Sequence, residues 1–493
     1  MNSKITKATL PLAALLAAAS AAQAADTYTV TEGGLTTTYD AVSYYSKPLA
    51  YSTTRDPDPP KYVTPASKSP WSLLNDYSWL DAGLDYRFRY EYRDDDIRRA
   101  VDGVDEPLLH RTRLYLGVHD VIDPLRFAVE IQDSHRYGSK FAKDNRDINQ
   151  HEPIRAYAEL YFKDLLPADA QGNSRPVSVR YGLHNFEFLD RRLIGNNQWR
   201  NTANSFRGVH ASVGQESSDW QVDLLHIQPM NRLTYQPDRT VAGQTVNAVI
   251  GHWRKWSEDV TIEPFYFQFK DTTVANGGRV VDSPGVRAYG VFGKSGFDFD
   301  ASVITQSGHN GSDNVDAWAA WTELGYSFGD PWKSRFSLFY GVISGDVTRN
   351  DGQDNRFERF FGFARPWSAD DYVILENLIA PKVRYEGQPD TNLKFDVGYS
   401  WFKLYSATDR FNNLASVPTA QNNINRDTTG QSGRNVGSEF DIRFLWQVTP
   451  QTLVTVGYAH FISGEWTKNR LRVAGRPTDD SDFAYVEVLT KLF

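Results

Sequence analysis

Cysteine is absent from this sequence of 493 residues, and methionine occurs only twice. A chain without cysteine can form neither a disulfide framework nor a zinc or iron–sulfur site held by thiolates. Beyond the N-terminal segment, the chain also lacks any run of the roughly 18 to 20 apolar residues that a membrane-spanning helix needs. Lysine and arginine (53) are outnumbered by aspartate and glutamate (61), and the net charge of −8 argues against general binding of nucleic acid.

The N-terminus has the features of a signal peptide. Lys4 and Lys7 precede an apolar run over 10–22, which is too short to cross a bilayer, and Ala22-Gln23-Ala24 matches a cleavage site. We therefore predict that residues 1–24 are removed and that the mature protein leaves the cytoplasm.

The next segment, residues 25–75, is rich in Thr, Ser, Tyr and Pro. It includes Asp56-Pro57-Asp58-Pro59-Pro60, a run that breaks regular secondary structure. We interpret this segment as an extended or loosely ordered leader in front of the main domain, residues 76–493.

In the main domain, polar and apolar side chains alternate. Over 82–93 the odd positions carry mainly Asp, Arg and Glu, whereas the even positions carry mainly Leu, Phe and Tyr. The same period of two returns at 125–132, 155–162 and 439–448. Successive side chains of a β-strand point to opposite faces, so each segment predicts a strand with one charged face and one apolar, aromatic face.

We count 18 candidate strands, most of them about ten residues long, which is the length that a tilted strand needs to cross a membrane. They are 82–93, 108–119, 124–133, 154–163, 177–184, 205–213, 219–228, 245–253, 259–269, 284–293, 296–306, 316–328, 334–343, 374–384, 392–405, 436–448, 451–462 and 482–493. The connections between them mostly alternate between short turns and long loops. An open sheet edge would leave backbone groups unpaired in lipid, so the strands have to close on themselves.

The predicted fold is all-β: a single closed antiparallel transmembrane β-barrel of about 18 strands, with short periplasmic turns and long extracellular loops. The interior of such a barrel can hold water, which reconciles a mean hydropathy of −0.51 with a place in a membrane. The 13 Trp and 26 Tyr fit the aromatic girdles of such barrels. A soluble extracellular β-protein, whose strands also alternate, is a weaker alternative.

The sequence shows no catalytic or metal-binding motif, and we predict no enzymatic activity, no cofactor and no metal site. The remaining chemistry lies in arginines on the predicted polar faces. The candidate pore-lining residues are Arg87, Arg89, Arg111, Arg113, Arg155, Arg180 and Arg443. One interpretation is a basic constriction that selects anions, as rings of Arg and Lys do in anion pores. The other is pairing with Glu91, Glu130, Glu159 and Glu439 that holds the wall rigid, and both remain open.

Several short motifs occur in a characteristic order along the chain. They are Ile131-Gln132-Asp133-Ser134-His135-Arg136, Val179-Arg180-Tyr181-Gly182-Leu183-His184, Arg191-Arg192-Leu193-Ile194-Gly195, Trp199-Arg200-Asn201-Thr202, Leu375-Glu376-Asn377-Leu378, Gly437-Ser438-Glu439-Phe440-Asp441 and Gly457-Tyr458-Ala459-His460-Phe461. Together they resemble the alginate export family of outer-membrane porins, over roughly residues 75 to 493. The resemblance implies an 18-stranded monomeric barrel in the Gram-negative outer membrane.

The best-known members of this family pass alginate, an acidic polysaccharide, through an arginine-rich constriction partly formed by inward-folded loops. By motif alignment, the resemblance implies that Arg155 and Arg180 line the pore. It also implies a possible constriction loop that carries Arg356, Arg359 and Arg365. Where the family usually has Gly-Arg-Gln, this chain has Gly182-Leu183-His184, which leaves solutes other than alginate as an alternative.

The expected function is therefore an outer-membrane porin that passes anionic solutes by passive diffusion, an acidic polysaccharide such as alginate among them. The expected partners are this solute, outer-membrane lipid and the barrel assembly machinery, with no nucleic acid. Two alternatives are a porin for small non-alginate solutes and a barrel that serves as scaffold for an enzymatic or adhesive function of its long loops.

Overall fold

The computed structural model describes residues 29–32, 35–38, 48–69, 74–99, 102–362, 365–411, 418–419 and 422–492. The predicted signal peptide, residues 1–24, lies outside these ranges. Ahead of the main domain the chain forms the short strands β1 (Thr29–Glu32), β2 (Leu35–Thr38) and β3 (Thr64–Pro65), and the 3-10 turn η2 (Ala66–Lys68).

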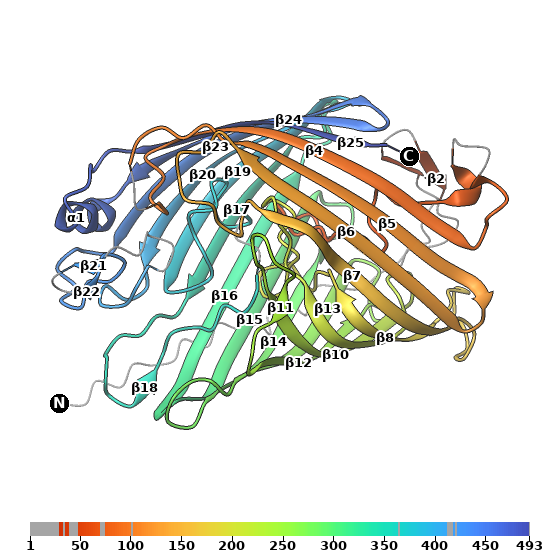
Figure 1. Cartoon of the computed structure of the whole chain (residues 1–493), viewed down its shortest axis with the longest axis horizontal. Coiled ribbons are helices and arrows are strands. Elements are labelled where there is room, and N and C mark those ends of the chain that lie inside the picture. The colour runs from red at the N-terminus through yellow and green to blue at the C-terminus, as the bar shows by residue number, and fades with distance from the viewer. Residues whose placement is uncertain are drawn as a thin grey trace.

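Eighteen long strands form one closed antiparallel sheet (Figure 1). They are β4 (Leu80–Asp94), β5 (Leu108–Ile122), β6 (Leu125–Tyr137), β7 (Asn149–Phe162), β8 (Val177–His184), β9 (Phe206–Val213), β10 (Trp220–Asn231), β12 (Gln244–Trp253), β13 (Val260–Asp271), β14 (Arg279–Val291), β15 (Phe297–Asn310), β16 (Asp313–Ser327), β17 (Arg335–Ile343), β19 (Leu378–Asp390), β20 (Leu393–Leu404), β23 (Asn435–Thr449), β24 (Thr452–Ser463) and β25 (Ser481–Lys491). β25 pairs with β4, and this last pairing closes the barrel. The predicted fold class is confirmed.

Each predicted strand corresponds to one observed strand; 177–184 has the predicted bounds, and the others are shifted at one or both ends. The largest correction concerns the predicted strand 374–384, which is β19 at Leu378–Asp390. The strand begins four residues later than predicted because Asn377 has a φ of 49°, outside the extended region. The side-chain oxygen of Asn377 accepts a hydrogen bond from the backbone N–H of Ser406. The short strands β11 (Arg239–Thr240), β18 (Gln353–Asp354), β21 (Pro418–Thr419) and β22 (Asn422–Asn423) add to the long loops.

Turns and loops divide between the two ends of the barrel. In Figure 1 the helix α1 (Glu465–Val473) and the strands β21 and β22 lie at the end opposite the C-terminus. Long connections such as 344–377 belong to that end, and short ones such as Asp123-Pro124 belong to the other. The connection 163–176 lies on the short-turn side but is long, an exception to the alternation of short turns and long loops. Conversely, β15 and β16 extend further than predicted, so that only Gly311 and Ser312 join them on the long-loop side.

The burial pattern of the wall is inverted relative to a soluble protein. On β5, Arg111 and Arg113 are 4% and 2% exposed, whereas Leu114 and Leu116 are 38% and 46% exposed. Charged side chains therefore face the interior and apolar ones face outward, where a soluble protein would leave them against water. Among the described residues, no helix is long and apolar enough to cross a bilayer.

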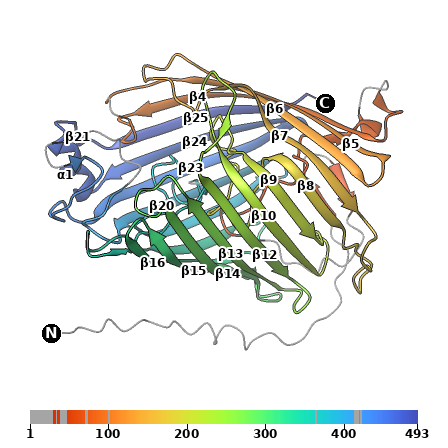
Figure 2. The ribbon, with the colours of Figure 1, turned by 60° about the horizontal axis from the view of Figure 1, so that its bottom comes forward.

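Two long loops fold back into the barrel and form much of its apolar core. One joins β8 to β9 (185–205) and the other joins β17 to β19 (344–377). Ile194 of the first forms a bridge to Phe361 of the second, and both loops pack against the inner faces of strands β10 to β16. Figure 2 shows this flank of the wall from outside. The sequence predicted both loops as long but not their inward course.

Candidate functional site

Four arginines, two from each strand, form a staggered patch on the inner face of β4 and β5. In the antiparallel register Arg87 lies opposite Arg111, while Arg89 lies opposite Leu109 and Arg113 lies opposite Asp85, one on each side of that pair. None of the four is more than 4% exposed. Like charges across a strand pair are destabilising, so the partners of these guanidinium groups determine what the patch can do.

The β8–β9 loop supplies backbone partners for the β4 half of this patch. Arg87 donates hydrogen bonds to the carbonyl oxygens of Gln198 and Arg200, both at 2.8 Å. Arg89 donates to the carbonyl oxygen of Trp199 at 2.7 Å, and it also lies 2.9 Å from Glu91 and 3.2 Å from Glu487. The loop thus presents three successive carbonyl groups to the wall.

The β5 half is held mainly by neutral groups. Arg111 donates to the carbonyl oxygen of Gln198 at 3.2 Å, and Asp85 lies 3.8 Å away. Arg113 donates to the side-chain oxygens of Gln132, at 2.7 Å, and of Gln198. Neutral acceptors satisfy a guanidinium group without cancelling its charge.

Arg155 on β7 and Arg180 on β8 share one carboxylate, that of Asp58 in the leader. Each also has a partner on the wall: Arg155 lies 3.1 Å from Glu130, and Arg180 lies 2.9 Å from Glu159. Burial opposes ionisation of Asp58, but the two guanidinium groups hold its pKa well below the ordinary value of 3.8. The leader therefore reaches into the barrel and contacts two of the predicted pore-lining arginines.

Arg443 on β23 lies 2.7 Å from Asp396 on β20. The neighbouring Arg384 on β19 is paired with Asp396 at 2.5 Å and with Asp441 at 2.6 Å. The ring of Tyr51, from the leader, lies 3.6 Å from the guanidinium carbon of Arg384 and 5.6 Å from that of Arg443. The sequence analysis missed Arg384, although the same period of two places it on the inner face.

The three arginines predicted for a constriction loop have different surroundings. Arg356 pairs with Asp409 of another extracellular loop at 2.6 Å, and Arg359 is exposed. Arg365 is 4% exposed and lies 3.6 Å from the ring of Trp199. Of the three, Arg365 is the one that meets the β8–β9 loop beside the arginine patch.

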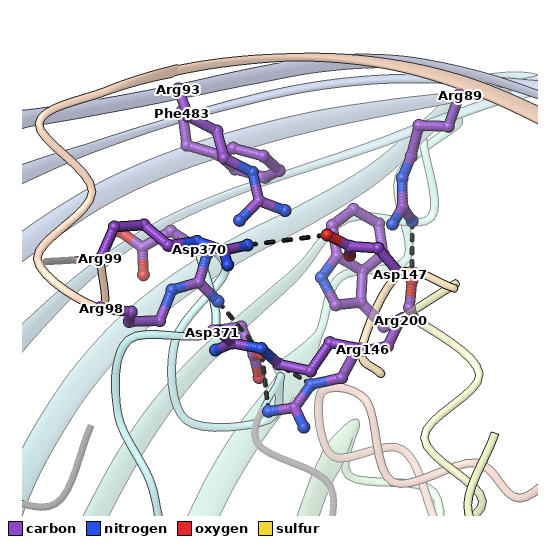
Figure 3. A pocket seen from close by; sticks show the side chains of 11 residues that line it. Arg89, Arg93, Arg98, Arg99, Arg146, Asp147, Arg200, Asp370, Asp371 and Phe483 are labelled. Atoms are coloured by element: carbon purple, nitrogen blue, oxygen red, sulfur yellow. Dashed lines mark hydrogen bonds and ion pairs between the residues drawn. The ribbon is translucent and has the colours of Figure 1, made fainter. Parts of the chain in front are cut away.

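A small pocket next to the patch is lined by six arginines and three aspartates (Figure 3). The lining residues are Arg89, Arg93, Arg98, Arg99, Arg146, Asp147, Trp199, Arg200, Asp370, Asp371 and Phe483. Asp371 accepts from Arg98 at 3.2 Å and from Arg200 at 2.8 Å. A volume of about 20 Å³ holds one water molecule, so in this conformation the pocket is filled by its own side chains.

The alternative role of the wall arginines, pairing that stiffens the barrel, is present as well. Three of the four predicted glutamate partners make such pairs: Glu91 with Arg89, Glu130 with Arg155, and Glu159 with Arg180. The prediction is wrong for Glu439, which instead accepts from the Ser368 hydroxyl at 2.6 Å and the Ala369 N–H at 2.7 Å. Glu439 thereby ties the β17–β19 loop to the wall.

Other site residues were missed for a simple reason. Arg98, Arg99 and Arg146 lie in long extracellular loops, where no periodicity indicates which way a side chain points. Arg200 belongs to a recognised motif, but the motif alone gave it no role. The inward fold of the β8–β9 loop brings Arg200 to within 2.8 Å of Asp371 in the β17–β19 loop.

Solved structures with the same architecture come from Pseudomonas aeruginosa. OpdQ matches with a TM-score of 0.55 at 14% identity, over 84% of this chain and 97% of that one. OccK11 (OpdR) gives 0.53 at 13%, over 84% and 96%, and OpdK with vanillate gives 0.54 at 11%, over 83% and 98%. At such identities these structures show the fold alone.

No curated protein matches this sequence. The model of one family, alginate export, matches residues 78–476. This match covers most of the chain, agrees with the motifs of the sequence, and fits the 18-stranded barrel with its charged interior. The chain belongs to the alginate export family of outer-membrane barrels.

Proposed function

We propose that this barrel is a passive porin for anionic solutes, with an acidic polysaccharide such as alginate as the candidate cargo. The observation that carries the proposal is the patch of Arg87, Arg89, Arg111 and Arg113, to which the β8–β9 loop supplies backbone carbonyl and amide oxygens. Glu91 and Glu487 pair with the β4 half of the patch, whereas Arg111 and Arg113 of the β5 half have mainly neutral partners. Fixed positive charge inside a pore lowers the barrier for carboxylates and raises it for cations. Diffusion needs no cofactor and no reaction.

The charge of the whole chain does not oppose this proposal. The net charge of −8 is spread over the entire sequence, while a permeating ion responds to charges within about one Debye length, roughly 8 Å at physiological salt. The pocket of Figure 3 has more arginines than aspartates among its lining residues and adjoins the patch. A positive interior is therefore local.

The comparisons point to two kinds of carboxylated solute. The family suggests alginate, whereas one structural neighbour was crystallised with vanillate, a small aromatic carboxylate. Both carry carboxylate groups, which guanidinium groups bind with good geometry. A carboxylated solute is thus the class that we propose, and its size is left to experiment.

A bilayer experiment tests the proposal. The full mature chain, refolded and inserted into planar bilayers, is expected to give a reversal potential that favours anions under a salt gradient. This preference is expected to weaken as salt is added, because salt screens fixed charge. Alginate oligomers added on one side are expected to shift the reversal potential as permeating anions do, and neutral oligosaccharides of equal length are the control. An open channel without anion preference would refute the anionic proposal and leave the porin.

The alternative function, a barrel that serves as scaffold for its loops, requires a different structural feature. It requires a compact catalytic or metal constellation in the long loops. In the part of the chain that the structure describes, no cluster of His, Asp or Glu side chains could hold a metal ion. Absence of any conductance, combined with a catalytic activity or adhesion, would favour the scaffold over the porin.

A further inference from the structure

Residues 48–69, here called the strap, run through the interior of the barrel. Their contacts move from one side of the wall to the other. At its C-terminal end the strap pairs with β4 through β3, and Tyr62 contacts Glu130 on β6. In its middle, Asp58 contacts Arg155 on β7 and Arg180 on β8. Towards its N-terminal end, Arg55 contacts Glu216 in the β9–β10 turn, and Tyr51 contacts Glu323 on β16. The strap therefore crosses the path that a solute would take.

The base of the strap is fitted closely to the wall. Thr64 pairs with Ala82, and the Tyr62 hydroxyl donates to Glu130 at 2.7 Å. A Cβ atom on Gly83 would lie 2.7 Å from the carbonyl oxygen of Tyr62 and 2.9 Å from the Cα of Val63. The absence of a side chain at Gly83 is what lets the strap lie against β4.

The middle of the strap is held by charge. The Asp58 carboxylate bridges Arg155 and Arg180, a geometry that a solute carboxylate could adopt equally well. The flanking Pro57, Pro59 and Pro60 each fix a backbone φ angle, so less chain entropy opposes docking than in a run without proline. Asp56, two residues earlier, contacts no arginine in the hydrogen bonds of the described residues; its carboxylate accepts from Asn196 at 3.5 Å.

The far end of the strap is held by polar contacts. The backbone N–H of Tyr51 donates to Glu323 at 3.1 Å, and Arg191 of the β8–β9 loop donates to the carbonyl oxygen of Ser52 at 3.1 Å. Thr53 is fully buried. Polar and ionic contacts of this kind weaken when a competing anion binds the arginines, whereas an apolar plug would not respond.

We propose that the strap is the built-in occupant of a carboxylate site: Asp58 fills the site made by Arg155 and Arg180, and solute carboxylates displace it and so open the barrel. The identity of the competitor rests on the proposed anionic solute, while the docking of the strap does not. The strap thus acts as an internal competitor that keeps the pore closed until an anion is present.

Release of the strap is measurable without any conductance. The chain has no cysteine, so Thr53→Cys introduces a single thiol at a buried position of the strap. In detergent micelles its reaction with a maleimide is expected to be slow, and to become at least fivefold faster in saturating glucuronate than in glucose at equal ionic strength. With Arg155→Gln and Arg180→Gln added, glucuronate is expected to have no further effect. Equal rates in glucuronate and glucose would overturn the proposal.

A charge-neutral pair of variants gives the second test. Asp58→Asn is expected to raise both the labelling rate of Thr53→Cys and the mean bilayer current at least threefold. Asp56→Asn, the matched control in the same proline-rich run, is expected to leave both unchanged. Gly83→Val, which displaces the base of the strap sterically, is expected to act like Asp58→Asn without altering any charge. Unchanged labelling in Asp58→Asn and Gly83→Val would refute the strap as a releasable occupant.

The two proposals fail in different ways. An anion-selective pore whose current and labelling ignore Asp58→Asn would keep the proposed function and discard the strap mechanism. If Asp58→Asn releases the strap but the pore shows no anion preference, the strap is a releasable occupant. The proposed anionic function and the displacement of the strap by a solute carboxylate would then both be refuted.

Discussion

Replacing Arg111 and Arg113 together by glutamine is expected to lower the anion-to-cation permeability ratio. Both guanidinium groups lie on the inner wall, and their shortest contacts are with Gln132 and Gln198. The substitutions therefore break no short ion pair among the described residues, since Arg111 lies 3.8 Å from Asp85. Glutamine also keeps an amide that can bond to the same loop, so the fold is expected to survive.

The size of the effect follows from Coulomb's law with screening. At a distance of about 5 Å in water, a unit charge contributes about 0.8 kcal/mol, which a Debye length of about 10 Å reduces to about 0.5 kcal/mol. Each guanidinium group favours the anion and disfavours the cation by this amount, a difference of about 1 kcal/mol or roughly fivefold in the ratio. Removing both groups is therefore expected to lower the anion-to-cation permeability ratio about 30-fold at about 0.1 M salt. At about 1 M salt, where the Debye length is about 3 Å, the expected decrease is about threefold.

Reversal potentials at the two salt concentrations measure this ratio directly. Arg349→Gln is the matched control, because it removes the same charge from an exposed position in the β17–β19 loop. Its ratio is expected to stay close to that of the unmodified protein at both concentrations. An unchanged ratio in the double variant, or an equal shift in Arg349→Gln, would show that the β4–β5 patch is not the source of selectivity.

Three further predictions concern the elements that hold this interior. Trp199→Ala removes ring contacts to Arg89 at 4.2 Å and Arg365 at 3.6 Å, together about 1–4 kcal/mol, so tryptic cleavage of the β8–β9 loop is expected to quicken at least fivefold. Glu130→Ala removes a carboxylate partner of the buried Arg155, which is expected to lower the free energy of unfolding by about 3 kcal/mol. The barrel is therefore expected to unfold at a lower temperature than Glu130→Gln, measured as the temperature at which heating changes its migration on a gel. Arg155 and Arg180 lower the pKa of the buried Asp58, so the stability that its ion pairs give the docked strap is complete above the ordinary value of 3.8, declines below it and is lost as pH falls through the lowered pKa. The current is expected to rise over that acidic range, and Asp58→Asn is expected to lack the rise.

The wall of the barrel was predictable because its physics is local. A strand between lipid and an aqueous interior must alternate, so the period of two at 82–93 gave both the strand and the direction of Arg87 and Arg89. The same pattern placed Arg113 and Glu130 inside, where both are buried. Closure followed from the cost of an unpaired edge in lipid, without any information on neighbouring strands.

The contents of the barrel were not predictable in the same way. Residues 185–205 and the strap have no periodicity, and their position depends on contacts with residues more than a hundred positions away, such as Arg87 with Gln198. The motif around Trp199 pointed to the family but gave no direction for its side chain. Partners of the wall arginines were correct where they lie on adjacent strands, as for Arg155 and Glu130, and wrong for Glu439, whose partner is a loop.

The neutral partners of Arg111 and Arg113, the β5 half of the arginine patch, bear directly on how a barrel keeps a positive interior. A guanidinium group that has left bulk water needs acceptors for its N–H groups, and carboxylates are the strongest ones available. Carboxylates, however, cancel the field that an anion would feel, as they do around Arg384 and around Arg89, which lies 2.9 Å from Glu91 and 3.2 Å from Glu487. Backbone carbonyl groups supply the hydrogen bonds without the charge, and the β8–β9 loop delivers them at Gln198, Trp199 and Arg200. The inward loop thus both narrows the barrel and preserves its local charge, so shortening it would widen the pore while leaving the arginines to be satisfied by water.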